Sequence, residues 1–291
     1  MAKKKGNSAN RMVLTFIVVI LLALGGGFLG AKLSGGGGGG DDASAQGSWL
    51  QEIKDRGVLR VGVAISPPHT VELEDGTFGG PNLIPLQNLA DALNVKLETV
   101  PAEWKNIVAG LQAGRYDFAA NLDRTLERAT AVQFTNPVWD YPAAMAVMAD
   151  APYTTVDDVV TSGNPISIVT GSAASGGFPR KFPEANYQES DAYTSSLQTL
   201  LAGRVVAITG DLPTLVSFAQ ENSDVKIILP DPDVYRGFAA YGVPATADAR
   251  SVETVNIAIE RAINDGLMDE AYAKVGYVTE DQLGEAGLLK Q

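Results

Sequence analysis

From Trp49 to the C-terminus, hydrophobic and polar positions alternate along the chain in two periods. Short runs rich in Val, Ile and Leu are typical of buried strands, whereas apolar residues three and four positions apart are typical of helices. The predicted strands are Val58–Ile65, Val95–Val100, Tyr116–Ala120, Ile166–Val169, Val205–Thr209 and Val225–Leu229. The predicted helices are Leu83–Leu93, Trp104–Ala113, Ser195–Ala202, one opening at Gly210–Pro213, Asp248–Asp265 and Leu267–Val275.

This order of strands and helices predicts an α/β fold with βαβ units. One round of elements precedes Ala143, and a second round starts near Thr154. Extended segments near Ala143–Met148 and Gly237–Val243 separate the rounds, and they predict two crossings between two lobes. The length of 291 residues suits one large domain or two smaller ones.

A long apolar run precedes this body. Residues 12–31 carry no charge, and about 20 apolar residues span a bilayer core as a helix. Lys3–Lys5 and Arg11 come before the run, so residues 1–11 are expected to stay in the cytoplasm as a basic stub. Residues 32–48 are expected to form a glycine-rich linker between this helix and a body that lies outside the cytoplasm, in the periplasm. An uncleaved signal anchor is favoured because secretory apolar regions are shorter, while cleavage near Ala43–Ala45 and secretion remain the alternative.

The composition narrows the classes of function. With 34 acidic and 22 basic residues, the formal net charge is −12, which disfavours binding to nucleic-acid phosphates. The chain has no Cys, which excludes disulfides, thiolate metal sites and Cys nucleophiles. A single histidine, His69, disfavours a His-rich metal site and a Ser–His triad. We therefore expect neither a metal ion nor a cofactor.

The segment Asn121–Arg128 carries the main candidate chemistry. Thr125 is a residue type that begins helices, and Arg128 follows in the first turn. A cation there faces the positive end of the helix dipole and costs up to ~1 kcal/mol unless an anion answers it. Arg128 therefore either pairs with a carboxylate such as Glu127 as surface structure, or points into a cleft where its planar guanidinium grips the carboxylate of a ligand.

A series of short motifs in fixed order carries a family resemblance. The motifs are Arg56–Gly62, Asp75–Gly80, Ala90–Lys96, Trp104–Gly114 with Tyr116 and Asp117, Thr125–Arg128, Gln133–Pro137, Gly203 and Arg204 with Gly210 and Asp211, and Asp265 and Gly266 with Tyr272–Lys274. Together they resemble the type II periplasmic solute-binding proteins of family 3, which supply polar amino acids to ABC importers. The resemblance implies a two-lobed fold, with residues 49–143 plus 242–291 in one lobe and 144–241 in the other. It also implies a ligand cleft between the lobes and contact with the importer's permease subunits.

The same resemblance implies two anchors for a zwitterionic ligand. Arg128 matches the arginine that clamps the ligand's α-carboxylate, and Asp211 matches the aspartate that holds its α-ammonium group. Gly171 and Ser172 fall in the loop that donates hydrogen bonds to the carboxylate. Asp211 also suits a helix N-cap ahead of Pro213, and Ser172 suits one as well, so a purely structural role stays open for both.

The remaining candidate residues line the side-chain part of the implied site. Trp104 falls where an aromatic wall is usual, although it equally suits an amphipathic core. Asn121 and Asp123 fall where small hydroxyl residues are usual. The carboxylate of Asp123 either selects a cationic or amide side chain of the ligand or pairs with Arg124.

Three further positions depart from the family pattern. Ser66 stands where an aromatic residue is usual, His69 where a Phe is usual, and Ile84 where an acid is usual. His69 suits a partly exposed loop imidazole. If it lines the cleft instead, ligand binding is expected to vary with pH near the unperturbed histidine pKa of ~6.5.

Three functions are compatible with these residues. The first is an extracytoplasmic amino-acid-binding protein that closes by a hinge and has no chemistry of its own. The second is an enzyme on the same scaffold, of the cyclohexadienyl dehydratase kind, which needs a general acid in the cleft. The third is a sensor or scaffold domain that has lost ligand binding. The presence of both Arg128 and Asp211 favours the first.

Overall fold

The computed structural model describes residues 48–275. The predicted basic stub 1–11, the apolar helix 12–31 and the linker up to residue 47 lie outside the described residues. Within 48–275, the helices are too short or too polar to cross a membrane.

A mixed sheet of ten strands organises the described residues, in the order β4-β1-β5-β12-β7-β10-β8-β9, with β6 paired to β12 and β11 to β7. A separate hairpin pairs β2 with β3. The strands are β1 Val58–Val63, β2 Val71–Glu72, β3 Phe78–Gly79, β4 Lys96–Pro101, β5 Phe118–Asp123, β6 Gln133–Phe134, β7 Trp139–Met148, β8 Ile166–Val169, β9 Tyr187–Ser190, β10 Ala207–Asp211, β11 Val225–Ile228 and β12 Arg236–Val243.

The helices supply the crossovers that parallel strands require. They are α1 Trp49–Arg56, the 3-10 turn η1 Pro81–Leu83, α2 Ile84–Leu93, α3 Ile107–Gln112, α4 Leu126–Ala129, α5 Val156–Val160, α6 Ala173–Lys181, α7 Tyr193–Leu201, α8 Leu212–Glu221, α9 Ala249–Asn264 and α10 Leu267–Lys274. Strand β1 is parallel to β4 and β5, and β8 is parallel to β9 and β10. The sheet therefore has two parallel groups, each built by βαβ units.

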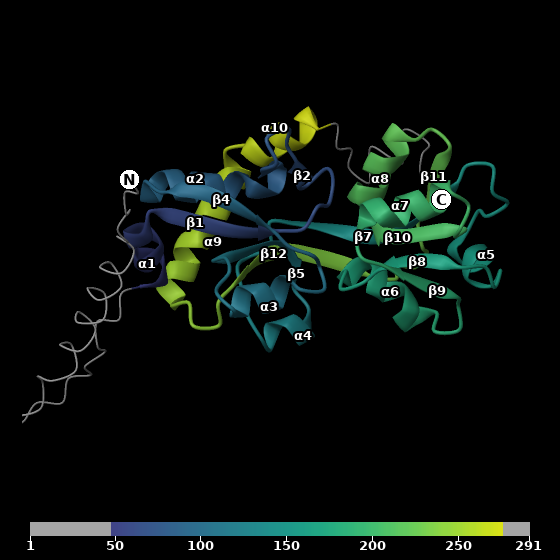
Figure 1. Ribbon diagram of the computed structural model, residues 1–291, viewed down its shortest axis with the longest axis horizontal. Helices are drawn as coiled ribbons and strands as arrows, with labels where there is room; N and C mark the ends of the chain where they lie inside the picture. Colours follow the sequence, from purple (N-terminus) through teal and green to yellow (C-terminus); the bar gives the residue numbers. More distant parts are fainter. Residues whose placement is uncertain (1–47, 276–291) are drawn as a thin grey trace, which may run out of the picture. The chain divides into compact units, whose positions relative to one another are not determined.

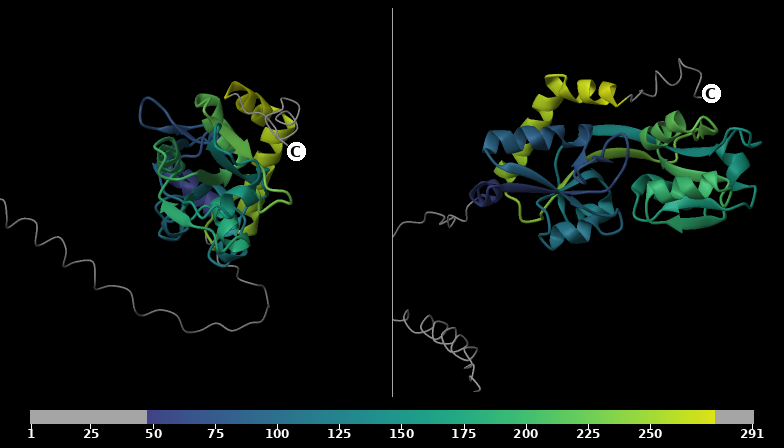
Figure 2. Two further views of the ribbon diagram at one scale, coloured as in Figure 1. Left: turned by 90° about the vertical axis from the view of Figure 1, so that its right-hand side faces the viewer. Right: turned by 45° about the horizontal axis from the view of Figure 1, so that its top comes forward.

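Strands β7 and β12 link the two groups (Figure 1). Residues 139–142 of β7 pair antiparallel with 236–239 of β12, whereas residues 143–147 of β7 pair with β10. Strand β12 continues beside β5. The second view of Figure 2 shows both strands running from one group to the other. These are the two segments for which the sequence predicts crossings.

Buried apolar side chains hold each group of strands to its helices. One cluster joins β1 to α2 and α9 and includes Leu59, Leu86 and Ile259. Helix α9 contributes Val255, Ile259 and Ala262, which lie on one face at helical spacing. Another cluster packs β7 and β8 against α6, and a third extends from α3 to α7 and α8.

Two elements near the cleft differ from the sequence prediction. Helix α3 starts at Ile107, because Glu103–Asn106 forms a turn in which the Asn106 N–H donates to the Glu103 carbonyl at 2.8 Å. Trp104 therefore lies in the loop before the helix. Strand β5 runs on to Asp123, because Leu122 and Asp123 pair with Ala240 and Ala239 of β12. This extension fixes the side chains of Asn121 and Asp123 on a strand.

Candidate functional site

The helix that carries Arg128 is a single turn. Thr125 caps it as predicted, since its Oγ1 accepts a hydrogen bond from the Arg128 N–H at 3.2 Å. The helix has only four residues, so it lacks the dipole of a longer helix and the predicted electrostatic penalty on Arg128 does not apply. The position of Arg128 is set by its side-chain contacts instead.

The guanidinium of Arg128 bridges the two halves of the sheet. Its Nη1 donates to the backbone carbonyl of Asp123 at 3.1 Å, and its Nη2 donates to the backbone carbonyl of Gly171 at 2.7 Å. A guanidinium has five N–H donors, so N–H groups remain for the carboxylate of a ligand. The contact with Gly171 is possible because this loop lies close to Trp104 and Lys105: a Cβ on Gly171 would lie 2.5 Å from the Lys105 nitrogen.

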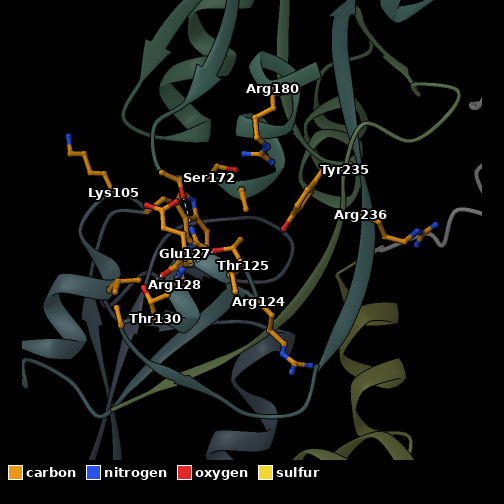
Figure 3. Close-up of a pocket in the computed structure, with 16 residues that line it drawn as sticks. Lys105, Arg124, Thr125, Glu127, Arg128, Thr130, Ser172, Arg180, Tyr235 and Arg236 are labelled. Carbon is orange, nitrogen blue, oxygen red and sulfur yellow. Dashed lines mark hydrogen bonds between the residues drawn. The ribbon is translucent and has the colours of Figure 1, made fainter. Parts of the chain in front are cut away.

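A cavity of about 730 Å³ opens beside Arg128. Its lining includes Trp104, Thr125, Gly171, Ser172 and several cations: Lys105, Arg124, Arg128, Arg180 and Arg236. In Figure 3, Arg180 and Tyr235 point toward the side of the cavity that holds Ser172 and Thr125, while Lys105, Arg124 and Arg236 point outward. Arg180 stacks over the Tyr235 ring at 5.8 Å. The mouth of the site is therefore basic in a protein whose net charge is negative.

A buried, acidic part of the site adjoins this cavity, although its carboxylates do not line the cavity. The Asp123 side chain is almost completely buried, and the Tyr141 hydroxyl lies 2.6 and 2.5 Å from its two carboxylate oxygens. Burial raises the pKa of Asp123 to about 6, although the Tyr141 hydrogen bond and the Arg128 charge act in the opposite direction. Asp123 does not pair with Arg124, so that alternative from the sequence is wrong.

Asp211 is a second buried carboxylate at the same site. It caps α8, with its Oδ1 accepting a hydrogen bond from the Thr214 N–H at 2.9 Å. Burial raises the pKa of Asp211, and hydrogen bonds from Thr214 and Tyr193 oppose that shift. The cap predicted from the sequence is confirmed, and the charge of Asp211 also raises the pKa of Asp123. The two carboxylates therefore act on each other.

His69 is fully buried, so the expectation of a partly exposed imidazole is wrong. Its ring stacks on Trp139 with centroids 3.7 Å apart, and its Nδ1 lies 2.9 Å from the Tyr272 hydroxyl. The Nε2 atom lies 3.8 Å from Asp211 Oδ1. Burial holds the pKa of His69 well below 6.5, so the imidazole is neutral at physiological pH and the predicted titration near its ordinary value does not occur.

The other predicted residues also reach this site. Ser66 Oγ lies 2.9 Å from Thr214 Oγ1, one turn into the helix that Asp211 caps. Asn121, with φ of 53°, accepts a hydrogen bond from Trp139 Nε1 at 3.2 Å. Ser172 caps α6 as predicted, and its Oγ lies 2.7 Å from the Tyr193 hydroxyl.

Trp104 fits both readings of the sequence. Its side chain is buried within the third cluster, and it also lines the cavity. Its Nε1 donor is buried and makes no hydrogen bond within residues 48–275. A continuous series of contacts thus runs through the site. Arg128 contacts Gly171, and the adjacent Ser172 contacts Tyr193, which donates to Asp211. Asp211 lies beside His69, which stacks on Trp139, and Trp139 donates to Asn121.

Sequence reasoning missed several members of this site. They are Trp139, Tyr141, Tyr193, Thr214, Arg180 and Tyr235. A signal for two of them exists, because Trp139 and Tyr141 stand two positions apart just before the predicted crossing Ala143–Met148, and residues so spaced share one face if the strand extends to them. Tyr193 and Arg180 carry no comparable signal in the sequence.

Comparisons with known proteins identify the chain's family and its fold. The chain matches the bacterial extracellular solute-binding proteins, family 3, over residues 59–277. It is similar to a cyclohexadienyl dehydratase of Pseudomonas aeruginosa, with 30% identity over 149 residues, which is 50% of this chain and 54% of that protein. It is also similar to a probable amino-acid ABC transporter periplasmic-binding protein of Sinorhizobium fredii, with 24% identity over 63% of each chain. These matches span less than two thirds of either relative.

The solved structures include a longer match. The solute receptor for L-cysteine of Neisseria gonorrhoeae superimposes with a TM-score of 0.71 and 27% identity, covering 81% of this chain and 96% of that one. The chain belongs to the bacterial extracellular solute-binding proteins of family 3. The predicted α/β fold of the type II periplasmic binding proteins, with two crossing segments, is confirmed.

Proposed function

We propose that this protein binds an amino acid, or a similar small zwitterion, outside the cytoplasmic membrane and delivers it to an ABC importer. The observation that carries the proposal is the separation of charge within one site. The guanidinium of Arg128 lies at the basic mouth, and the carboxylate of Asp211 lies in the buried acidic part. A ligand with a carboxylate at one end and an ammonium group at the other matches this arrangement.

The lobes of the proposed hinge are residues 49–143 plus 242–291 and residues 144–241. In support, the partners of β7 change at residue 143, from β12 to β10. Side-chain contacts join the proposed lobes across the site; they include Arg128 with Gly171, Ser66 with Thr214, and Lys105 with Asp191. Opening of the hinge breaks these contacts and admits the ligand. Residues 12–31 anchor the protein to the cytoplasmic membrane, beside the permease subunits.

A thermal-shift screen of the full-length protein against the amino acids tests the proposal. A ligand at 100 times its Kd stabilises the folded state by about 2.7 kcal/mol, which raises the unfolding midpoint of a protein of this size by several degrees. The shift should disappear in Arg128→Ala and persist in the control Arg261→Ala, whose exposed side chain on α9 pairs with Asp265 and does not line the cavity. Absence of a shift with every amino acid contradicts the proposal and leaves the sensor or scaffold alternative.

A second candidate function is the dehydratase-like enzyme. Asp123 favours it, because a buried carboxyl with a pKa of about 6 is suited to general-acid work. The Pseudomonas relative is a cyclohexadienyl dehydratase, but the match spans about half of that protein. Turnover of prephenate or arogenate by the full-length protein, lost in Asp123→Asn, would support this candidate over simple binding.

A further inference from the structure

The buried part of the site holds more negative than positive charge. Asp123 and Asp211 are both buried, and the cation that acts on Asp123 is Arg128. His69 lies beside Asp211 but is neutral. A neutral zwitterion adds one charge of each sign, so the site would keep one unbalanced buried carboxylate. Burying an unbalanced charge is costly.

We infer that Asp123 selects a ligand with a second cationic group, so that the bound amino acid carries a net positive charge. This inference rests on the proposed function, in which Arg128 and Asp211 hold the α-carboxylate and the α-ammonium group. Asp123 then pairs with a cationic group on the ligand's side chain. In the complex, the negative charges of Asp123, Asp211 and the ligand's carboxylate are balanced by the positive charges of Arg128 and the ligand's two cationic groups.

The groups around Asp123 leave this role open to the ligand. Tyr141 from β7 donates to it, Arg128 from α4 acts on it as a cation, and Asp211 from β10 acts on it as an anion. The hydroxyls of Tyr193 and Tyr235 also face its charge, and burial keeps both protonated and neutral. The Arg128 N–H groups donate to the backbone carbonyls of Asp123 and Gly171.

The cations at the mouth of the cavity do not cancel the excess negative charge of the buried carboxylates. Arg124 and Arg180 are exposed, and solvent and salt screen exposed charges from buried ones. Arg180 is also engaged with the ring of Tyr235. The mouth steers the carboxylate end of the ligand, whereas the buried carboxylates set its net charge.

One independent feature indicates a ligand with an acceptor group. The buried Nε1 donor of Trp104 makes no hydrogen bond among the described residues, and it can donate to an acceptor such as the ligand's carboxylate. Within residues 48–275, His, Asp and Glu side chains form no cluster of three suited to a metal ion.

The inference predicts how affinity changes with pH. A cationic ligand needs Asp123 ionised, so its binding releases a proton and strengthens as the pH rises through about 6. A neutral ligand of the same shape binds best with Asp123 protonated, so its binding takes up a proton and weakens over the same range. Asp211 must be ionised for both ligands, so its titration cancels in the ratio of the two dissociation constants.

Isothermal titration of the full-length protein with L-arginine and with L-citrulline provides this ratio, because the two ligands have the same shape and differ by one charge. L-Lysine and L-norleucine form a second pair. We expect the cationic member of at least one pair to bind roughly tenfold more tightly or better near neutral pH. The preference should shrink from about pH 8 to about pH 5.

The variant Asp123→Asn keeps the acceptor for Tyr141 and removes the charge, and Asp123→Thr restores the hydroxyl residue usual in the family. In both, the preference for the cationic member should fall to a few-fold and stop depending on pH. Equal or tighter binding of the neutral members by the wild-type protein overturns the inference but leaves amino-acid binding intact. Loss of all amino-acid binding in the wild-type protein contradicts the proposed function itself.

Discussion

Asp123 and Tyr141 form a buried pair. The Tyr141 hydroxyl donates to the Asp123 carboxylate and lies 2.6 and 2.5 Å from its two oxygens. The hydrogen bond compensates only part of the cost of burial, because the pKa of Asp123 is raised from 3.8 to about 6. A carboxyl with a raised pKa binds its proton more tightly in the folded state than in the unfolded state. Its contribution to stability is therefore present at low pH and is lost as the pH rises from about 4 to about 6.

Replacing Asp123 by Asn should stabilise the ligand-free protein near neutral pH. The charge costs on the order of 2–3 kcal/mol, since each pKa unit corresponds to about 1.4 kcal/mol. The unfolding midpoint of Asp123→Asn should exceed that of the wild-type protein by several degrees near pH 7.5, and the two should converge near pH 4. Thermal unfolding followed by circular dichroism measures both.

The control for this prediction is Asp140→Asn. Asp140 lies next to Tyr141 on β7, but its side chain is half-exposed and pairs with Arg236 on the surface at 2.7 Å. Exposed pairs contribute about 0–1 kcal/mol, so this variant should unfold near the wild-type temperature at both pH values. A wild-type midpoint equal to or above that of Asp123→Asn near pH 7.5 would contradict the inferred cost of burying the Asp123 charge.

Replacing Arg128 by Lys should weaken ligand binding while the positive charge stays. The guanidinium reaches the carbonyls of Asp123 and Gly171 and still has donors for a ligand, whereas an ammonium group is a single point with three donors. We expect affinity to fall by roughly tenfold to a hundredfold, since hydrogen bonds to charged groups are worth about 1.5–3 kcal/mol. Calorimetric titration measures this loss, and an affinity within about threefold of wild type would argue against bidentate recognition.

Two substitutions at Asp211 separate its capping role from its role in binding. Asn is as good an N-cap as Asp, so Asp211→Asn should keep the hydrogen bond from the Thr214 N–H and remain stably folded. It lacks the charge for the ammonium group, so affinity should fall by roughly tenfold or more. Asp211→Ala should lose about 1 kcal/mol of stability in addition.

Equal affinities of Asp211→Asn and the wild-type protein would mean that Asp211 is only a cap. Thermal unfolding and titration of the same two preparations decide between the outcomes. Because burial raises the pKa of Asp211, removal of its charge should also leave the ligand-free Asn variant at least as stable as wild type near neutral pH.

Gly237 is required by the close approach of β12 to the buried pair. A Cβ there would lie 2.4 Å from Tyr141 Cζ and 2.7 Å from Asp123 Oδ1. Gly237→Ala should therefore displace the pair, cost about 1–3 kcal/mol of stability and weaken ligand binding. The matched control is Gly176→Ala in α6, where a Cβ would meet only the flexible end of Arg180 at 3.3 Å. That variant should gain roughly 0.5–1 kcal/mol from helix propensity.

Elements with strong periodicity were predictable from the sequence. Helix α9 matches the predicted Asp248–Asp265 segment because its apolar residues repeat at helical spacing and Asp248 caps it. Strands β1, β8 and β11 match as runs of β-branched residues. The predicted start of α3 was wrong because a local turn precedes the helix. The predicted end of β5 was wrong because pairing with the distant strand β12 extends the strand to Asp123.

The anchors of the site were predictable as a set of motifs, but their environment was not. His69 illustrates this, since its loop gave no indication that Trp139 and Tyr272 would enclose the ring. Tyr141 was missed for the same reason, because it is 18 residues from Asp123 in the chain and meets it only through the sheet.

The sequence by itself determined the α/β class, the helix caps at Thr125, Ser172 and Asp211, and the family motifs that mark Arg128. These depend on periodicity and on hydrogen bonds between residues three positions apart, which short segments encode. Only the tertiary structure decided that Asp123 pairs with Tyr141, that His69 is neutral, and that Arg128 donates to Gly171. Burial and contacts across the sheet set pKa values and donor partners, and both depend on which distant strands become neighbours.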